Sequence, residues 1–154
     1  MISLYPLSHR YDEDVYEYGR DPEFCRHIGA RPFASLGEAS VFVEGMISDT
    51  ASRKRHYWFI KHDKDKKVIG TIGFIFTWGR SPGRPFEIGY GVSRAYWGTG
   101  VFHAALNELI VEAKRRRTHK LIAITNGNQR PFMARAGEER LHPRRPHTGL
   151  LRQR

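Results

Sequence analysis

The residues best suited to chemistry form one run from Glu87 to His103, in which Gly98 and Gly100 separate a β-prone segment from a helical one. Glycine lets the backbone approach a ligand closely. The first turn of a helix offers unpaired N–H groups and the positive end of the helix dipole. This combination favours an anion, with pyrophosphate as the natural ligand, although a tight turn before a close-packed helix fits it too. The run is neither a dinucleotide-binding fingerprint, because His103 replaces the third glycine, nor a P-loop, because no Gly-Lys-Ser/Thr follows.

The segments on either side of this turn must hold it in place. Residues 86–92 and 119–125 are rich in β-branched and apolar side chains, which predicts two strands. Residues 101–117 between them have helical periodicity, with an inward face of Ala105, Leu106, Leu109, Ile110 and Ala113. A strand–helix–strand order implies a right-handed crossover between parallel strands.

The part of the chain before the turn predicts a different pairing. Residues 2–7 and 57–60 read as strands, and residues 61–67 read as a hairpin turn into a long strand over 68–76. Two helical regions intervene, one within 11–29 and one after a Ser-x-x-Glu capping box at Ser35. We expect their inward residues to be Val15, Tyr18, Phe24, Ile28, Ala39, Phe42, Val43 and Met46. The fold class is therefore α/β, with a mixed sheet that is antiparallel first and parallel later.

The amino-acid composition limits the classes of protein to which the chain can belong. The 154 residues, 40% hydrophobic and 27% charged, predict one globular domain. A single cysteine, Cys25, excludes an internal disulfide framework and a Cys-rich zinc site. The eight histidines show no paired metal-ligand spacing, so no metal is expected. No apolar run is long enough for a membrane span, and the first residues do not resemble a signal peptide. We therefore expect a cytoplasmic protein.

The positive charge is concentrated at the C-terminal end. Residues 1–113 balance 14 Lys and Arg against 14 Asp and Glu, whereas residues 114–154 carry 12 and 2, so the whole net charge of +10 lies there. Such asymmetry suggests an anionic partner, such as a phosphorylated cofactor, nucleic acid or an acidic protein surface, with a solvated basic tail as the alternative. The cluster from Lys114 to Arg117 could contact a phosphorylated cofactor or RNA, with a solvated helix end as the alternative.

The sequence also resembles a known family. The run EIGYGVSRAYWGTGVFHAAL is similar to the acetyl-CoA-binding segment of the GCN5-related N-acetyltransferases (GNAT), in particular the branch of the ribosomal-protein N-acetyltransferases RimJ and RimL. WFIKHDKDKKVIGTIGFIF resembles the central hairpin of that family, and DPEFCRHIG resembles its first-helix motif. Asn126, eleven positions before Gly137, matches the spacing of a further family element. The resemblance covers roughly residues 1–137.

This resemblance implies a cofactor and its contacts. Acetyl-CoA would lie in a cleft where strand 87–92 splays from strand 120–125, with helices on both faces of the sheet. Its pantetheine arm would pair with the backbone around Val92 and Ser93 and contact Asn126. Trp97 would take the first place of the family's cofactor-binding signature. The pyrophosphate would lie on the N–H groups that follow it, namely those of Gly98, Thr99, Gly100, Val101 and Phe102. Phe102 is bulkier than the small residue usual at that place.

The resemblance also implies a reaction. An acetyl group would pass directly to a primary amine, on a protein N-terminus or a small molecule, without a covalent enzyme intermediate. Glu87 is the candidate general base, with binding of the substrate ammonium or lining of the sheet as the alternative roles. The tyrosine that commonly serves as general acid is replaced by Met133.

The last residues depart from the family. Residues 138–154 form an atypical basic tail with two prolines, so the last hairpin should be missing, shortened or supplied (swapped) by another subunit. An exposed sheet edge would favour a homodimer. The chain is thus expected to be a single N-acetyltransferase-like domain over 1–154. The alternative is a non-catalytic module of the same fold that binds RNA or the ribosome through its basic C-terminal quarter.

Overall fold

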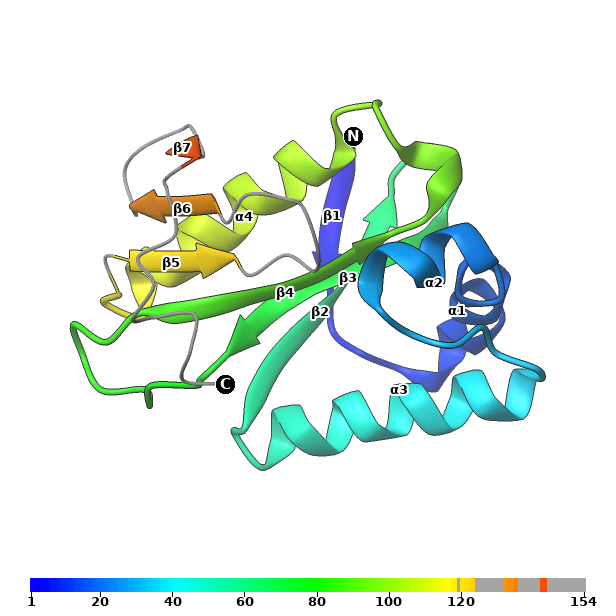
Figure 1. The fold of residues 1–154 in the computed structure, drawn as a ribbon, viewed down its shortest axis with the longest axis horizontal. Coiled ribbons are helices and arrows are strands. Elements are labelled where there is room, and N and C mark those ends of the chain that lie inside the picture. Colours follow the sequence, from blue (N-terminus) through cyan, green and yellow to red (C-terminus); the bar gives the residue numbers. More distant parts are fainter. Residues whose placement is uncertain (119, 124–131, 136–141, 144–154) are drawn as a thin grey trace.

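A seven-stranded mixed sheet forms the centre of the protein in the computed structural model, which describes residues 1–118, 120–123, 132–135 and 142–143. The strands lie in chain order: β1 Ile2–Tyr5, β2 Arg55–His62, β3 Lys67–Ile75, β4 Phe86–Val92, β5 Lys120–Ala123, β6 Phe132–Arg135 and β7 His142–Pro143 (Figure 1). The pair β4–β5 is parallel and every other neighbouring pair is antiparallel. The predicted mixed α/β sheet is confirmed.

The four described helices are α1 Asp12–Gly19, α2 Pro22–Ile28, α3 Leu36–Ala51 and α4 Val101–Arg115. Two of them, α2 and α3, begin where their capping residues predict. The Asp21 carboxylate accepts a hydrogen bond from the Glu23 N–H at the start of α2, and the Ser35 hydroxyl accepts one from the Glu38 N–H at the start of α3. These side chains satisfy first-turn donors that would otherwise face solvent. Helix α4 differs, because its N-cap Gly100 has no side chain.

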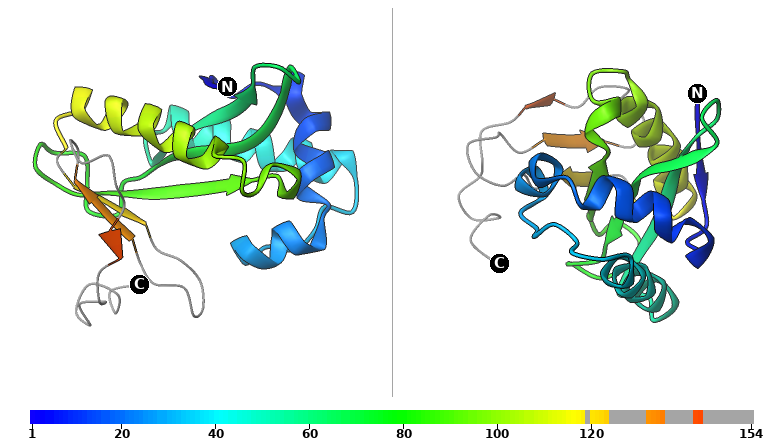
Figure 2. Two further views of the ribbon diagram at one scale, coloured as in Figure 1. Left: turned by 90° about the horizontal axis from the view of Figure 1, so that it is seen from above. Right: turned by 90° about the vertical axis from the view of Figure 1, so that its right-hand side faces the viewer.

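Each face of the sheet buries its own apolar cluster. Helix α4 covers one face, where the predicted inward residues of this helix are all buried against β3, β4 and β5. Helices α1, α2 and α3 cover the opposite face, where Val15, Phe24 and Val43 pack against Phe59 and Val68. Figure 2 shows α4 and α2 on opposite sides of β4. Residues that alternate along β4 therefore belong to different sides of the protein.

Two expectations about the fold need correction or refinement. Ile28 and Phe42, expected to point inward, keep 38% and 42% of their surface exposed. After Gly137, where the last hairpin was expected to be missing, shortened or supplied by another subunit, only β7 is described, so that expectation stays a prediction. Strand β6 precedes Gly137, in a segment for which the sequence pattern predicted no strand.

His9 lies between two carboxylates and links the short turn before α1 to α3. The His9 Nδ1 lies 3.0 Å from Asp12 Oδ2, and its Nε2 lies 2.5 Å from Glu44 Oε2. Hydrogen bonds to Glu44, and then to Asp12, raise the pKa of His9 above its usual value.

This pair of contacts predicts a pH-dependent part of the stability. Because the pKa of His9 is raised in the folded state, its two contacts contribute fully to the free energy of unfolding below the unfolded-state pKa, about 6.5. This contribution is lost as the pH rises through the folded-state pKa. Urea unfolding from pH 5 to 9 should show a stability gap between wild type and His9→Gln that closes with rising pH. Parallel curves for the two proteins would contradict the assignment.

Candidate functional site

Among the described residues, the edge of β4 that faces β5 is paired only at its beginning. The register joins Phe86, Glu87 and Ile88 to Leu121, Ile122 and Ala123, where the described part of β5 ends. On its β3 side the pairing continues to Val92. The splay expected between the two parallel strands beyond Ile88 stays a prediction, and the remaining β4 edge, Gly89–Val92, is called the open edge below.

The open edge of β4 presents the backbone of Tyr90 and Val92. The Ser93 N–H donates to the Ile69 carbonyl at 2.7 Å, which makes this an antiparallel hydrogen-bonded pair. Because such pairs alternate along a ladder, Gly91 and Gly89 also bond toward β3. The N–H and C=O groups of Tyr90 and Val92 then point to the β5 side, where an extended ligand can pair with them.

The glycine turn leads directly into an uncapped helix. Gly98 and Gly100 have φ values of 73° and 86°, the left-handed region that favours glycine. A Cβ atom built on either glycine would have no other atom within 4 Å, so the turn is open to solvent. The first described bond of α4 runs from the Ala104 N–H to the Gly100 carbonyl. The N–H groups of Val101, Phe102 and His103 make no hydrogen bond to other described residues.

Several backbone groups predicted to contact the cofactor are already bonded inside the protein. The Ser93 N–H is bonded to Ile69, and its carbonyl accepts the Tyr96 N–H at 3.0 Å, so the backbone pairing expected at Ser93 does not fit this structure. The Val92 carbonyl accepts the indole Nε1–H of Trp97 at 2.8 Å. In the glycine turn, the Thr99 N–H donates to the Tyr96 carbonyl at 3.4 Å. The register of the ladder places the backbone groups of Tyr90, and not those of Ser93, on the β5 side.

The bulky Phe102 packs away from the turn. Its ring centroid lies 4.6 Å from that of Tyr90, with the planes tilted by 38°. Because its side chain is used in packing against β4, the open space at Gly98 and Gly100 remains clear. A large residue at this place therefore does not obstruct the N–H groups of the helix start.

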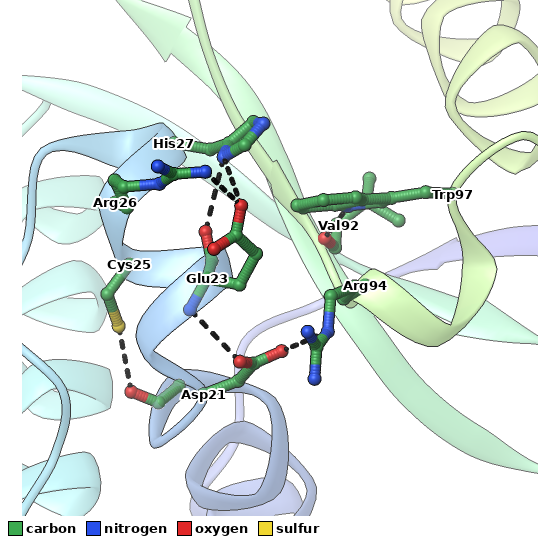
Figure 3. A network of polar contacts seen from close by, with 9 residues as sticks. Asp21, Glu23, Cys25, Arg26, His27, Val92, Arg94 and Trp97 are labelled. Atoms are coloured by element: carbon green, nitrogen blue, oxygen red, sulfur yellow. Dashed lines mark hydrogen bonds and ion pairs between the residues drawn. The ribbon is translucent and has the colours of Figure 1, made fainter.

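Helix α2 is fastened to the turn that carries these donors (Figure 3). The Arg94 guanidinium lies 2.8 Å from the Asp21 carboxylate that also caps α2. The imidazole of His27 lies against the indole of Trp97, with ring centroids 4.6 Å apart. One side of α2 thus touches the glycine turn, while Phe24 from the same helix packs beneath β4 at Gly91.

Glu87 lies on the sheet face that α1, α2 and α3 cover. Its neighbours Phe86 and Ile88 point to the α4 side, so alternation places Glu87 with Gly89 and Gly91 on the other side. The side chain is buried, and the Thr77 hydroxyl donates to its Oε2 at 2.7 Å. A buried carboxylate held by a hydroxyl is able to take a proton from a substrate group that reaches it.

The sequence did not single out Tyr57 and Thr77 as site residues. The Tyr57 ring lies over Gly73 and Gly89, since a Cβ on Gly89 would come within 3.1 Å of its hydroxyl oxygen. Burial raises the pKa of Tyr57, so the phenol stays protonated at neutral pH. The signal for Tyr57 was present in the two glycines at matching positions of neighbouring strands, which leave room for one ring.

A cavity of about 410 Å³ lies on the same face of the sheet as Glu87, between the sheet and helices α1 to α3. Its wall includes Tyr57 from β2 and Tyr90 and Gly91 from the unpaired stretch of β4. The volume is within the range of small-molecule pockets. The cavity therefore meets the open edge of β4 from the side that carries Glu87.

The remaining predicted site residues lie either outside the described residues or away from the glycine turn. Asn126 lies outside the described residues, as does the tail from 144 onward; Met133 lies on β6. Lys114 to Arg117 lie at the far end of α4 from Gly100, about 20 Å away at 1.5 Å per residue. They are too distant to share a phosphate with the glycine turn. Within the described ranges, no group of His, Cys, Asp or Glu has the arrangement of a metal site, and no helix is long and apolar enough to span a membrane.

These features define a class of protein: an α/β fold with a mixed sheet, in which an uncapped, glycine-led helix connects two parallel strands. Residues 2–136 match the family model for the acetyltransferase (GNAT) domain, and the chain belongs to that family.

Relatives and solved structures agree with this assignment. An uncharacterized N-acetyltransferase, p20, from Bacillus licheniformis is 33% identical over 102 residues, which cover 64% of this chain and 55% of that protein. The chain thus matches about half the length of that curated relative. The microcin C7 self-immunity acetyltransferase MccE, solved with acetyl-CoA and AMP, has a TM-score of 0.68 at 23% identity, over 79% of this chain and 68% of its own. RimL, a ribosomal-protein α-N-acetyltransferase solved with coenzyme A, has a TM-score of 0.67 at 14% identity, over 83% and 72%.

Proposed function

We propose that this protein is an acetyl-CoA-dependent N-acetyltransferase that transfers an acetyl group to a primary amine by direct attack. The observation that carries the proposal is the uncapped start of α4, which presents three N–H donors next to the open edge of β4. The names of p20, MccE and RimL support the same chemistry. RimL also makes the RimJ/RimL branch our preferred place within the family.

The residues present fit the cofactor. Of the N–H groups from Gly98 to Phe102, that of Thr99 donates to Tyr96, and the others would hold the diphosphate, because they lie in an open turn at the positive end of a helix. Backbone groups of Tyr90 and the N–H of Val92, whose carbonyl accepts the Trp97 indole, would pair with the amides of its pantetheine arm. When bound, acetyl-CoA supplies a thioester carbonyl as the acyl donor.

The acceptor would approach from the cavity side. An ammonium group is not nucleophilic, so a base must remove its proton, and Glu87 lies on the cavity face of β4. Thr77 fixes one carboxylate oxygen of Glu87. Burial raises the pKa of Tyr57, so its phenol would stay neutral and could donate a hydrogen bond to a substrate group beside it. Met133 cannot donate a proton, so solvent would protonate the leaving thiolate.

Cofactor binding is the first test. Calorimetry should show saturable, stoichiometric binding of acetyl-CoA, and free thiol should appear when an acceptor amine is added. The second candidate, a non-catalytic module that binds RNA through the basic C-terminal quarter, predicts no acetyl-CoA binding and an RNA affinity that falls steeply with salt. Absence of acetyl-CoA binding at millimolar concentration would overturn the enzymatic proposal.

A further inference from the structure

Three basic segments of the chain meet at one end of the sheet. They are residues 53–56, 80–84 and 114–120, which together carry ten Lys and Arg and no Asp or Glu. The strand register brings them together, because Arg55 at the start of β2 pairs with Ile75 at the end of β3, and β4 and β5 begin beside it. Figure 1 shows the loop between β3 and β4 and the end of α4 at this end, away from the glycine turn. We call this surface the basic end.

Two contacts join the three segments to one another. The Arg116 Nη2 donates to the Nδ1 of His56 at 3.2 Å, and the hydroxyl of Thr118 donates to the Arg84 carbonyl at 2.7 Å. Thr118 is buried, and the Arg116 guanidinium lies 5.6 Å from the centre of the Trp58 ring. The fold therefore holds the basic end together as one surface.

The charge of the basic end is far from neutralised by the described carboxylates. Among them, only Asp49 and Glu112 form ion pairs with it, Asp49 with Arg55 and Glu112 with Arg115 and Arg116. Eight of the ten basic residues are exposed. Half of the ten come from residues 1–113, whose net charge is zero, so only the fold gathers them with the end of α4. Such a surface attracts a ligand with many negative charges.

Aromatic rings lie among these cations. Trp78 is in the loop that carries Arg80 and Arg84, and it is only half-buried. Within the described ranges, no aromatic ring packs on Trp78, and Trp78 belongs to neither apolar cluster of the sheet. Cations beside an unpacked indole suit a single strand of nucleic acid, because phosphates bind the cations and a base stacks on the ring. An acidic protein surface would use the cations and leave the indole unused.

We propose that the basic end binds a single strand of nucleic acid, with its phosphates on the lysines and arginines and one base stacked on Trp78. This binding goes beyond the proposed function and does not depend on it, because the glycine turn lies at the other end of β4 and α4. It requires no residue after Lys120, and so differs from binding through the C-terminal tail. The protein would hold acetyl-CoA and the strand at the same time.

The first test removes one cation from each segment while the C-terminal tail stays intact. Lys54→Gln/Arg84→Gln/Lys114→Gln changes three exposed residues. The probe is a single-stranded RNA of about 15 nucleotides, and fluorescence anisotropy measures its affinity as a function of salt. The affinity should fall on the order of tenfold at physiological salt. The slope of log K against log salt should fall in magnitude by about 2, because each phosphate contact on a single strand contributes about 0.7.

A matched triple variant controls for net charge. Arg10→Gln/Lys64→Gln/Lys66→Gln removes the same charge from exposed residues outside the basic end, two of them in the turn between β2 and β3. Its RNA affinity and salt slope should stay close to those of wild type, and both triple variants should keep the wild-type affinity for acetyl-CoA. Equal losses of RNA affinity in the two triple variants would overturn the assignment of the basic end.

The second test separates base stacking from charge. Trp78→Leu should weaken binding of the RNA by about tenfold, the usual effect of losing one stacked base. It should not change the affinity for an abasic strand of the same length, which keeps the phosphates and lacks the bases. An equal loss for both strands, or no loss for either, would contradict stacking on Trp78.

Other polyanions test the class of ligand. A DNA strand of the same sequence should bind within a few-fold of the RNA, because phosphates and bases occur in both. A polyglutamate peptide of equal charge should bind at least tenfold more weakly than the RNA. Equal affinity for the peptide would identify the basic end as a site for an acidic protein and overturn the nucleic-acid assignment.

The last test asks whether the two ligands bind at separate places. Acetyl-CoA at about ten times its Kd, with matched ionic strength, should leave the RNA affinity unchanged. Displacement of the RNA by acetyl-CoA would place the RNA at the glycine turn and overturn this inference. Failure of acetyl-CoA to bind, with RNA binding as expected here, would overturn the proposed function alone.

Discussion

Glu87→Gln should lower kcat by about 100-fold or more, the usual contribution of a positioned general base. The amide has nearly the same shape and still accepts the hydrogen bond from the Thr77 hydroxyl, so the fold and the local geometry are kept. It cannot take a proton from an ammonium group. Steady-state thiol release at saturating acetyl-CoA and acceptor measures the effect.

Two controls separate proton transfer from other roles of Glu87. Acetyl-CoA affinity should be unchanged in Glu87→Gln, because the cofactor donors lie at the other end of β4 and at the start of α4. Raising the pH should partly restore the rate, since more of the amine is then deprotonated in solution. Full turnover in the variant at neutral pH would remove Glu87 from the mechanism and leave it as a buried sheet residue.

Gly100→Asp should weaken acetyl-CoA binding by on the order of 100-fold, because a carboxylate would stand beside the site of a diphosphate. The space around the Gly100 Cβ position is open, so the side chain fits without a clash. Calorimetric titration with acetyl-CoA measures the change.

Gly100→Asn is the matched control for this charge. Both residues tolerate a positive φ better than most, and both carry the same strain, about 1 kcal/mol. The Asn variant should lose only a few-fold in affinity. The Asp variant should be as stable as the Asn variant or slightly more so, because a negative charge at a helix start is favourable. Equal affinities in the two variants would contradict a phosphate site at α4.

Local sequence patterns predicted those helices whose start or buried face depends only on nearby residues. The caps Asp21 and Ser35 and the apolar stripe of α4 fixed their helices, because each depends on neighbours within a turn or two. The cavity could not be predicted in this way. Ile28 and Phe42 have the spacing of core residues, and only the tertiary arrangement of α2 and α3 leaves both of them open to it.

In the candidate site, too, some features follow from the local sequence and others depend on the tertiary structure. The open glycine turn follows from residue types, since Gly98 and Gly100 adopt positive φ values. The sequence could not show that Tyr90, and not Ser93, has its backbone groups on the open edge. This depends on which β4 residues bond to β3, and no pattern within a single strand sets that register.

The attachment of α2 to the glycine turn has a kinetic consequence. Asp21 and His27 hold this helix to Arg94 and Trp97, while Phe24 and Ile28 from the same helix line the cavity between the sheet and α1 to α3. Any ligand that steadies the turn therefore also steadies one wall of the neighbouring compartment. The two substrates should then bind in a preferred order, cofactor first, with the acceptor gaining affinity from the entropy that the cofactor has already removed.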